Sequence, residues 1–283
     1  MIEFRNITLE DRGRIERCRQ ESGNPFSALS FPSLFTWQEA YGLSIAGDSD
    51  FFVIKSVEND GFFAPCGNPE KCLHFLEEAY RRNGKIRVLY VTQEMAARAA
   101  GDGFRTRHMP ELSEYICSTQ RLMLKDEHIS ATYRKKCSRF ALDFPYSVRK
   151  IQEENIPELL HVIDGLEGIY GGPDAVDLSA ARISLQHYKD LGLTGILLRT
   201  QKGPIAFSFG FMSAPDIYTM STVKYDYRLP PEVTAVCTME EAELIVDPVP
   251  YCNLEEDLGH PGLRNAKLQL SPVRMQEVYA IEK

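Results

Sequence analysis

The sequence lacks the spacings that are typical of metal and redox centres. Its seven cysteines form no Cys-x-x-Cys pair, and its six histidines form no His-x-x-x-His pair. Zinc and dithiol sites are usually recognised by such pairs. We therefore expect no metal, and we expect the cysteines to be reduced thiols that are mostly buried.

Long apolar runs are also missing. Stretches such as Ile205–Met212 are much shorter than the ~20 residues that a membrane-spanning helix needs. The first residues, Met-Ile-Glu-Phe-Arg, do not form the apolar core of a signal peptide. We expect a cytoplasmic protein without a transmembrane segment. Neither a Walker phosphate loop nor a nucleophilic triad is visible, so the sequence points to no covalent intermediate.

Positive charge is scarce in the second half of the chain. The net charge of the 283 residues is −8; residues 1–125 carry 16 basic and 17 acidic side chains, and residues 126–283 carry 16 and 23. Phosphate neutralisation supplies most non-specific affinity for nucleic acids. An acidic chain would therefore need a local basic patch to bind RNA.

One basic patch is present, on a helix predicted over Ser130–Phe144. Its cations are Arg134, Lys135, Lys136 and Arg139. They would suit the phosphate oxygens of a tRNA or a nucleotide. They would equally suit a solvated helix face, and the pattern alone leaves both interpretations open.

Apolar periodicity predicts an α/β protein built from two similar units, residues 1–125 and 126–283. In the first unit we expect strands over Met1–Thr8, Gly42–Ala46, Phe51–Val57, Gly61–Cys66, Ile86–Val91, Phe104–Arg107 and Tyr115–Leu124, and helices over Glu10–Glu21, Phe31–Tyr41, Glu70–Asn83 and Gln93–Ala100. In the second we expect strands over Tyr146–Ile151, Thr194–Thr200, Pro204–Met212, Ile217–Val223 and Val273–Ile281, and helices over Ser130–Phe144, Ile156–Ile169, Ser179–Leu191 and Glu232–Val246. Gly168–Asp177 is predicted to be a loop that can move over a site.

The densest mixture of acids, glycines and spaced cations is Tyr251–Arg274. A strand end with polar residues at alternate positions turns at two glycines into a helix whose cations are three residues apart. The residues concerned are Asn253, Glu255, Asp257, Arg264 and Lys267. This pattern predicts a site in the second unit. It also fits an exposed turn whose carboxylates cap the helix and pair with its cations.

The run N-x-E-x-D-x-G-x-x-G-L-R-x-x-K-x-x-x-x-P, from Asn253 to Pro272, resembles the closing motif of the phosphatidylglycerol lysyltransferase C-terminal domain family. Weaker traces cover nearly the whole chain, among them Phe4–Asp11 and Gly192–Arg199. The resemblance implies two tandem acyl-CoA N-acyltransferase (GNAT)-like domains with mixed sheets, as in the Fem-type aminoacyl transferases. The family often has a Lys-Lys-Arg-Asn-His-like run in the basic helix, where this chain has Cys137-Ser138.

The resemblance also implies an activity, namely transfer of an acyl or aminoacyl group, with aminoacyl-tRNA as the expected donor. The acceptor would be an amine or hydroxyl on a lipid headgroup, a peptide or a small molecule. Asp257 and Glu255 would hold the donor's α-amino group or accept a proton. Arg264 and Lys267 would neutralise phosphate or the oxyanion. Asn253 would contact substrate.

Glycine is absent where a CoA-binding turn would be. In CoA-using members of the fold, a glycine-rich turn before a helix offers backbone N–H groups to pyrophosphate. Here Leu229–Glu232 contains two prolines and an acid, so acetyl-CoA is the less expected donor. Lys224, Tyr225 and Arg228 precede this turn and would contact a donor of another shape. The alternatives are a CoA-dependent acyltransferase with a non-standard site, and a non-catalytic binding protein.

Overall fold

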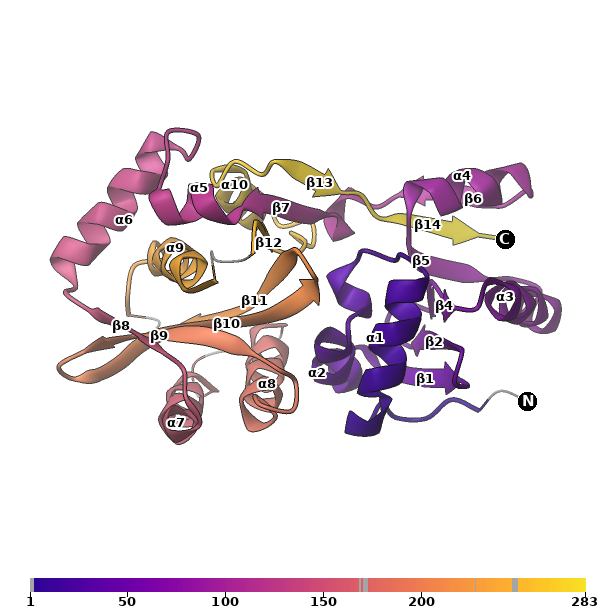
Figure 1. Cartoon of the computed structure of the whole chain (residues 1–283), viewed down its shortest axis with the longest axis horizontal. Coiled ribbons are helices and arrows are strands. Elements are labelled where there is room, and N and C mark those ends of the chain that lie inside the picture. Colours follow the sequence, from indigo (N-terminus) through magenta and orange to yellow (C-terminus); the bar gives the residue numbers. More distant parts are fainter. Residues whose placement is uncertain (1–2, 168, 170–172, 227, 246–248) are drawn as a thin grey trace. The chain divides into compact units, whose positions relative to one another are not determined.

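The computed structural model describes residues 3–167, 169, 173–226, 228–245 and 249–283 (Figure 1). The chain forms two compact units. Unit 1 comprises Met1–Glu114 and Gln276–Lys283, and unit 2 comprises Tyr115–Met275. Each unit contains a mixed sheet covered by helices, as the α/β prediction requires.

The helices of unit 1 match the sequence pattern closely. They are α1 (Arg12–Glu21), α2 (Phe31–Tyr41), α3 (Pro69–Asn83) and α4 (Gln93–Gly101). The predicted start of α3 is confirmed, since the Asn68 side chain accepts hydrogen bonds from the amides of Glu70 and Lys71 at 3.0 and 3.2 Å. Gly84, with φ of 67°, ends the same helix in the left-handed region.

The sheet of unit 1 has the strand order β1-β2-β3-β5-β14-β6, with β4 paired to β2. The strands are β1 (Leu43–Gly47), β2 (Phe51–Ser56), β3 (Gly61–Phe63), β4 (Cys66–Gly67), β5 (Arg87–Val91), β6 (Arg105–His108) and β14 (Tyr279–Glu282). Only β3 and β5 are paired in parallel among these described strands. Helix α3 makes the crossover between them, as parallel pairing demands.

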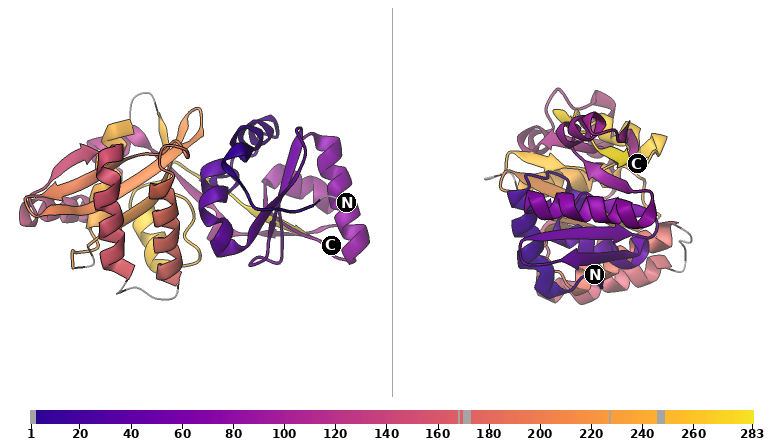
Figure 2. Two further views of the ribbon diagram at one scale, coloured as in Figure 1. Left: turned by 90° about the horizontal axis from the view of Figure 1, so that it is seen from below. Right: turned by 90° about the vertical axis from the view of Figure 1, so that its right-hand side faces the viewer.

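Unit 2 has the strand order β13-β7-β12-β11-β10-β9-β8. The strands are β7 (Glu114–Ser118), β8 (Ser147–Lys150), β9 (Thr194–Thr200), β10 (Gly203–Ala214), β11 (Ile217–Tyr225), β12 (Tyr251–Asn253) and β13 (Arg274–Gln276). The helices are α5 (Thr119–Leu124), α6 (Ala131–Asp143), α7 (Ile156–Glu167), α8 (Pro173–Gln186), α9 (Val233–Ile245) and α10 (Pro261–Leu268). Helix α9 packs on one face of this sheet, and α7 and α8 lie on the other (Figures 1 and 2).

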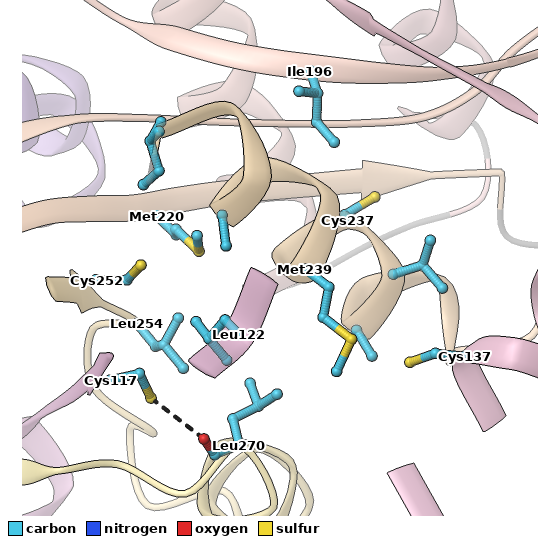
Figure 3. Close-up of a cluster of buried hydrophobic side chains, with 14 of the residues drawn as sticks. Cys117, Leu122, Cys137, Ile196, Met220, Cys237, Met239, Cys252, Leu254 and Leu270 are labelled. Carbon is cyan, nitrogen blue, oxygen red and sulfur yellow. Dashed lines mark hydrogen bonds between the residues drawn. The ribbon is translucent and has the colours of Figure 1, made fainter. Parts of the chain in front are cut away.

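The core of unit 2 lies between α9 and the strands and is rich in sulfur (Figure 3). It includes four of the cysteines, Cys117, Cys137, Cys237 and Cys252. All seven cysteines of the chain are unpaired, and only Cys72 is not buried. The prediction of mostly buried thiols is therefore confirmed. Buried cysteines act here as small apolar side chains.

Each sheet contains a strand that is distant in sequence from the strands on either side of it. Strand β7 lies between β12 and β13 in unit 2, and β14 lies between β5 and β6 in unit 1. The unit boundaries therefore differ from the predicted 1–125 and 126–283. A strand pattern indicates which face of a strand is buried, but it does not indicate which sheet the strand joins.

Four local predictions were wrong. Among its described residues, Met1–Thr8 forms only an isolated bridge between Arg5 and Ile45. The predicted strand Tyr115–Leu124 becomes helical after Ser118, whose side chain accepts a hydrogen bond from the Arg121 amide. Val273–Ile281 is divided between two strands in different sheets. Of the predicted loop Gly168–Asp177, residues 168 and 170–172 lie outside the described residues, and the chain from Pro173 onward is helical.

Candidate functional site

The open part of the unit 2 sheet is the second half of β11. This strand pairs with β10 over most of its length, but it pairs in parallel with β12 only from Ile217 to Thr219. The chain turns away after Asn253, so no described strand pairs with that edge of β11 beyond Thr219. The main-chain N–H and C=O groups on this edge beyond Thr219 therefore have no strand partner among the described residues, and such groups need another hydrogen-bonding partner.

A β-bulge lies at the same place. The register between β10 and β11 changes from Phe209 opposite Thr222 to Gly210 opposite Met220, which leaves Ser221 as an extra residue. The Ser221 hydroxyl donates to the Phe209 carbonyl at 3.2 Å. A bulge redirects the backbone of its strand locally. Bulge and free edge together create a place where main-chain N–H groups can meet a carbonyl oxygen.

The motif acid Asp257 is the centre of a closed hydrogen-bond network. Its Oδ1 accepts from the Gly259 amide (2.8 Å) and from Arg264 Nη2 (3.0 Å). Its Oδ2 accepts from the Tyr115 hydroxyl (2.5 Å) and from Arg264 Nε (2.8 Å). Asp257 is fully buried, whereas 44% of the Arg264 side chain is exposed. A carboxylate that accepts four hydrogen bonds has little capacity left for a substrate.

The hydrogen-bond network of Asp257 bears on the prediction that this acid accepts a proton, because it changes the pKa of the side chain. Burial alone would raise the pKa of Asp257, but the hydrogen bonds from Arg264, Tyr115 and the Gly259 amide outweigh it and lower the pKa to about 2. An acid of that pKa is a poor proton acceptor near neutrality. The Asp257 side chain is also fully enclosed, so it does not face solvent. Asp257 instead fixes the position of Arg264.

The remaining motif residues are brought together in the same turn. The Asn253 side chain accepts a hydrogen bond from the Glu255 amide at 2.7 Å, and the Lys267 ammonium donates to the main-chain oxygen of Glu256. Glu255 and Leu258 have φ values of 59° and 50°. Such conformations cost of order 1–3 kcal/mol each for non-glycine residues. The polar network therefore stabilises a strained turn.

Glu256 was not singled out from the sequence, although it lies inside the motif. It is half-buried, and burial raises its pKa despite the opposing charge of Lys267. The Lys267 ammonium also lies 5.8 Å from the centre of the Tyr115 ring. The adjacent acids Glu256 and Asp257 therefore have pKa values shifted in opposite directions, an arrangement that is common where two acids have different tasks.

The end of β11 holds the second predicted group. Lys224 is nearly buried, and its ammonium contacts Asp177 of α8 at 2.5 Å. Arg228 Nε donates to Asp226 at 2.8 Å. The ring of Tyr225 packs against the core of unit 2. Lys224 and Tyr225 are the last two residues of β11, and Arg228 follows them. Asp257 follows the carboxyl end of the parallel neighbour β12, so both groups lie toward the same end of the sheet.

Two of the four cations on the basic helix α6 form ion pairs. Lys136 lies 3.1 Å from Glu232, and Arg139 lies 3.3 Å from Asp143. Lys135 is exposed, and Nε of the half-buried Arg134 has no hydrogen-bond partner within the described residues. The interpretation as a solvated face therefore accounts for two of the four cations. Lys136 also neutralises the acid that precedes α9.

Two amides at the turn before α9 already have main-chain acceptors. The Val233 amide donates to the Pro230 carbonyl and the Thr234 amide to the Pro231 carbonyl, both at 3.1 Å. The two prolines themselves carry no N–H. These two amides are therefore not free to bind a pyrophosphate in this conformation, and disfavoured acetyl-CoA binding stays a prediction.

A buried polar cluster on α9 was also missed by sequence reasoning. Glu241 is fully buried and accepts a hydrogen bond from the Tyr218 hydroxyl at 2.8 Å. Tyr218 crosses β10 at Gly210, where a Cβ atom would lie 2.8 Å from the tyrosine ring. Burial raises the pKa of Glu241 to about 7. Tyr218 and Glu241 lie 23 residues apart in the sequence, so no local sequence pattern identifies them as partners.

Among the described residues, no helix is both long and apolar enough to cross a membrane. Residues 20–282 match the family described as phosphatidylglycerol lysyltransferase, C-terminal. No curated protein matches the chain.

Solved structures resemble nearly the whole chain. A conserved protein of unknown function from Bacteroides thetaiotaomicron is 28% identical, with a TM-score of 0.86 and 99% of each chain covered. The C-terminal domain of a putative lysylphosphatidylglycerol synthetase from Agrobacterium fabrum is 15% identical, with a TM-score of 0.65 and coverage of 97% of this chain and 91% of that one. A tandem GNAT protein from the clavulanic acid biosynthesis pathway is 10% identical, with a TM-score of 0.53 and coverage of 100% and 98%.

The predicted tandem GNAT-like fold is therefore confirmed, and the family match fits a transferase. Because the family match spans nearly all of both units, the chain belongs to the phosphatidylglycerol lysyltransferase C-terminal family.

Proposed function

We propose that the chain transfers an aminoacyl group from aminoacyl-tRNA to an amine or hydroxyl acceptor, on a lipid headgroup or a small molecule. The observation that carries the proposal is the free edge of β11 beside the Ser221 bulge. An acyl carbonyl placed there would receive hydrogen bonds from main-chain N–H groups. These bonds strengthen as negative charge develops on the oxygen.

In the proposed reaction, the acceptor nitrogen or oxygen attacks the carbonyl carbon of the aminoacyl ester. A bond forms between acceptor and acyl carbon, and the ester bond to the tRNA ribose breaks. The acceptor loses one proton, and the leaving ribose oxygen gains one. No covalent intermediate with the protein is needed, which agrees with the absence of a nucleophilic triad in the sequence.

We assign the motif residues on the basis of their contacts. Glu256 is the proposed proton acceptor, since its pKa is raised while that of the neighbouring Asp257 is lowered. Asp257 positions Arg264, whose half-exposed guanidinium would meet the phosphate of the donor. Lys267, Glu255 and Asn253 hold the turn, and Glu255 remains a candidate for the α-amino group of the donor.

Two cationic groups remain proposed contacts for tRNA. Lys135 and Arg134 on α6 are the best placed, because Lys136 and Arg139 are already paired. Lys224 and Arg228 would have to exchange their present carboxylate partners for the ligand. Tyr225 would contribute ring contacts at the end of β11.

The test is a comparison of charged tRNA, uncharged tRNA and acetyl-CoA as ligands of the purified full chain. We expect charged tRNA to bind in preference, and its ester to be consumed when an amine acceptor is added. Glu256→Gln should leave binding unchanged and slow transfer by at least about a hundredfold, the low end for a lost general base. The matched control is Glu243→Gln, on an exposed position of α9. Equal binding of charged and uncharged tRNA, with saturable binding of acetyl-CoA, would refute the proposal.

A further inference from the structure

Unit 1 contains a surface hollow that the proposed transfer does not use. It has a volume of about 940 Å³ and is lined by the ends of β2 and β14 and the beginnings of β3, β5 and β6. Five basic side chains and two acidic ones line it. This excess of positive charge contrasts with the net charge of −8 of the whole chain.

The basic residues come from neighbouring strands in register. Arg87 on β5 and Arg105 on β6 both lie opposite Glu282 of β14, which runs between them. Glu282 contacts Arg87 at 3.5 Å and Arg105 at 3.1 Å. The single carboxylate of Glu282 pairs with two guanidinium groups, so these three side chains carry one net positive charge.

Other cations add to this excess. Lys55 of β2 is exposed and makes no ion pair within the described part of the chain. Lys85 lies 3.6 Å from Asp60, but both side chains are largely exposed, so water screens their attraction. The Lys283 ammonium lies over the rings of Tyr80 and Phe104 and has no carboxylate side chain as a partner among the described residues. The side chains that line the hollow therefore carry about three net positive charges.

Part of this arrangement is held rigidly. Arg87 Nη1 donates to the Asn59 carbonyl at 3.0 Å, so its guanidinium is fixed in the wall of the hollow. A planar guanidinium held in place presents paired donors that match the oxygens of a phosphate group. Lys55 and Arg105 are both exposed; Lys55 can close on such a ligand directly, and Arg105 can do so from its solvent-exposed pair with Glu282.

We propose that this basic hollow of unit 1 binds a phosphate group with at least two negative charges, either on a small molecule or in a lipid headgroup. The charge excess, the shared carboxylate Glu282 and the fixed Arg87 support this ligand class. The proposal does not depend on the transfer reaction assigned to unit 2, and either can fail without the other.

The test is a calorimetric titration of the full chain with inorganic pyrophosphate at low ionic strength. We expect one saturable site, weakened by added NaCl, with the amide NMR signals of Gly61 and Gly103 shifting on binding. The double variant Lys55→Gln/Arg105→Gln should lose about tenfold in affinity or more. The control Arg149→Gln/Lys150→Gln removes the same charge from exposed positions of β8 and should change affinity less than about twofold.

A further variant should strengthen pyrophosphate binding. Glu282→Gln removes the carboxylate that the two arginines share, so pyrophosphate should bind more tightly, whereas a damaged fold would bind it less. Co-sedimentation with phosphatidylcholine vesicles containing phosphatidic acid identifies the source of the phosphate, since binding that Lys55→Gln/Arg105→Gln abolishes would indicate a lipid headgroup. No saturable pyrophosphate binding, or equal losses in the test and control variants, would overturn the proposal.

Discussion

Arg264 holds Asp257 by two parallel hydrogen bonds, from Nε to Oδ2 at 2.8 Å and from Nη2 to Oδ1 at 3.0 Å. The carboxylate is buried and the guanidinium is half-exposed. Helix α10, which carries Arg264, has no buried residue of its own. Polar contacts with the preceding turn, rather than apolar packing, therefore hold this helix in place.

Asp257→Asn should lower the free energy of unfolding by about 2 kcal/mol. Asparagine keeps the shape of the side chain but removes the charge that Arg264 and Tyr115 recognise. Urea denaturation measures the effect. The control is Asp143→Asn, which breaks an exposed pair with Arg139 and should cost less than about 0.5 kcal/mol. Equal effects of the two changes would mean that the network contributes no more than a surface pair.

The dependence of stability on pH should show the titration of Asp257 at acidic pH. The pKa of Asp257 is lowered to about 2 in the folded chain, against about 3.9 when unfolded. Its contribution is therefore fully present above the unfolded pKa and is lost as the pH falls from about 4 through about 2. Asp257→Asn should flatten this part of the profile, as urea midpoints between pH 5 and 2.5 would show.

Titration of Glu241 should change stability with pH in the opposite direction to titration of Asp257. Its folded pKa is raised to about 7, above the unfolded value of about 4.3. The folded chain thus retains a proton that the unfolded chain releases, so stability is full below about pH 4 and declines as the pH rises through 7.

Glu241→Gln preserves an acceptor for the Tyr218 hydroxyl and removes the titration. We expect this variant to be more stable than the parent at pH 8, by about 3 kcal/mol, and close to it at pH 4.5. Melting temperatures at the two pH values measure the difference. Glu243→Gln, at an exposed position of the same helix, is the control. A stability gain that is the same at both pH values would exclude a titrating Glu241 as its cause.

Secondary structure was predictable where one local pattern dominates. Helix α2 was expected over Phe31–Tyr41 and has those bounds, because its aromatic residues recur at helical spacing and Gly42 ends it. Contacts between distant residues could not be predicted in this way. Tyr115 and Asp257 lie 142 residues apart, and nothing near either residue identifies the other.

The same limit explains the errors at the candidate site. The motif pointed to Asp257 and Arg264 as neighbouring site residues, but it did not show that the hydroxyl of Tyr115 helps to enclose the acid. The placement of β14 in the sheet of unit 1 is likewise a matter of pairing between distant strands, and single-sequence patterns carry no information on it. The Ser221 bulge depends on the register between two strands, which the sequence of one strand does not specify.

Because β14 lies in the sheet of unit 1, a disruptive change in this strand should destabilise unit 1 and leave unit 2 unaffected. Ala280 is fully buried in β14, so Ala280→Asp places an uncompensated charge in the sheet of unit 1 and should destabilise that unit by more than about 3 kcal/mol. Hydrogen exchange should accelerate at β2 and β5 of unit 1 but not at β10 of unit 2. The control is Ala131→Asp, at the exposed first residue of α6, where an acid is tolerated. Faster hydrogen exchange confined to unit 2 would contradict the assignment of β14 to the sheet of unit 1.

Acetyl-CoA should not bind measurably to unit 2. At the start of α9, the amides of Val233 and Thr234 already donate to the carbonyls of Pro230 and Pro231, and the prolines supply no donors. Calorimetry of the full chain with acetyl-CoA tests this expectation. Pro230→Gly/Pro231→Gly restores two N–H groups and the freedom to approach a pyrophosphate, so any weak binding should strengthen in this variant. Saturable micromolar binding by the parent chain that disappears when the turn is changed would show that the prolines form a CoA site of another kind.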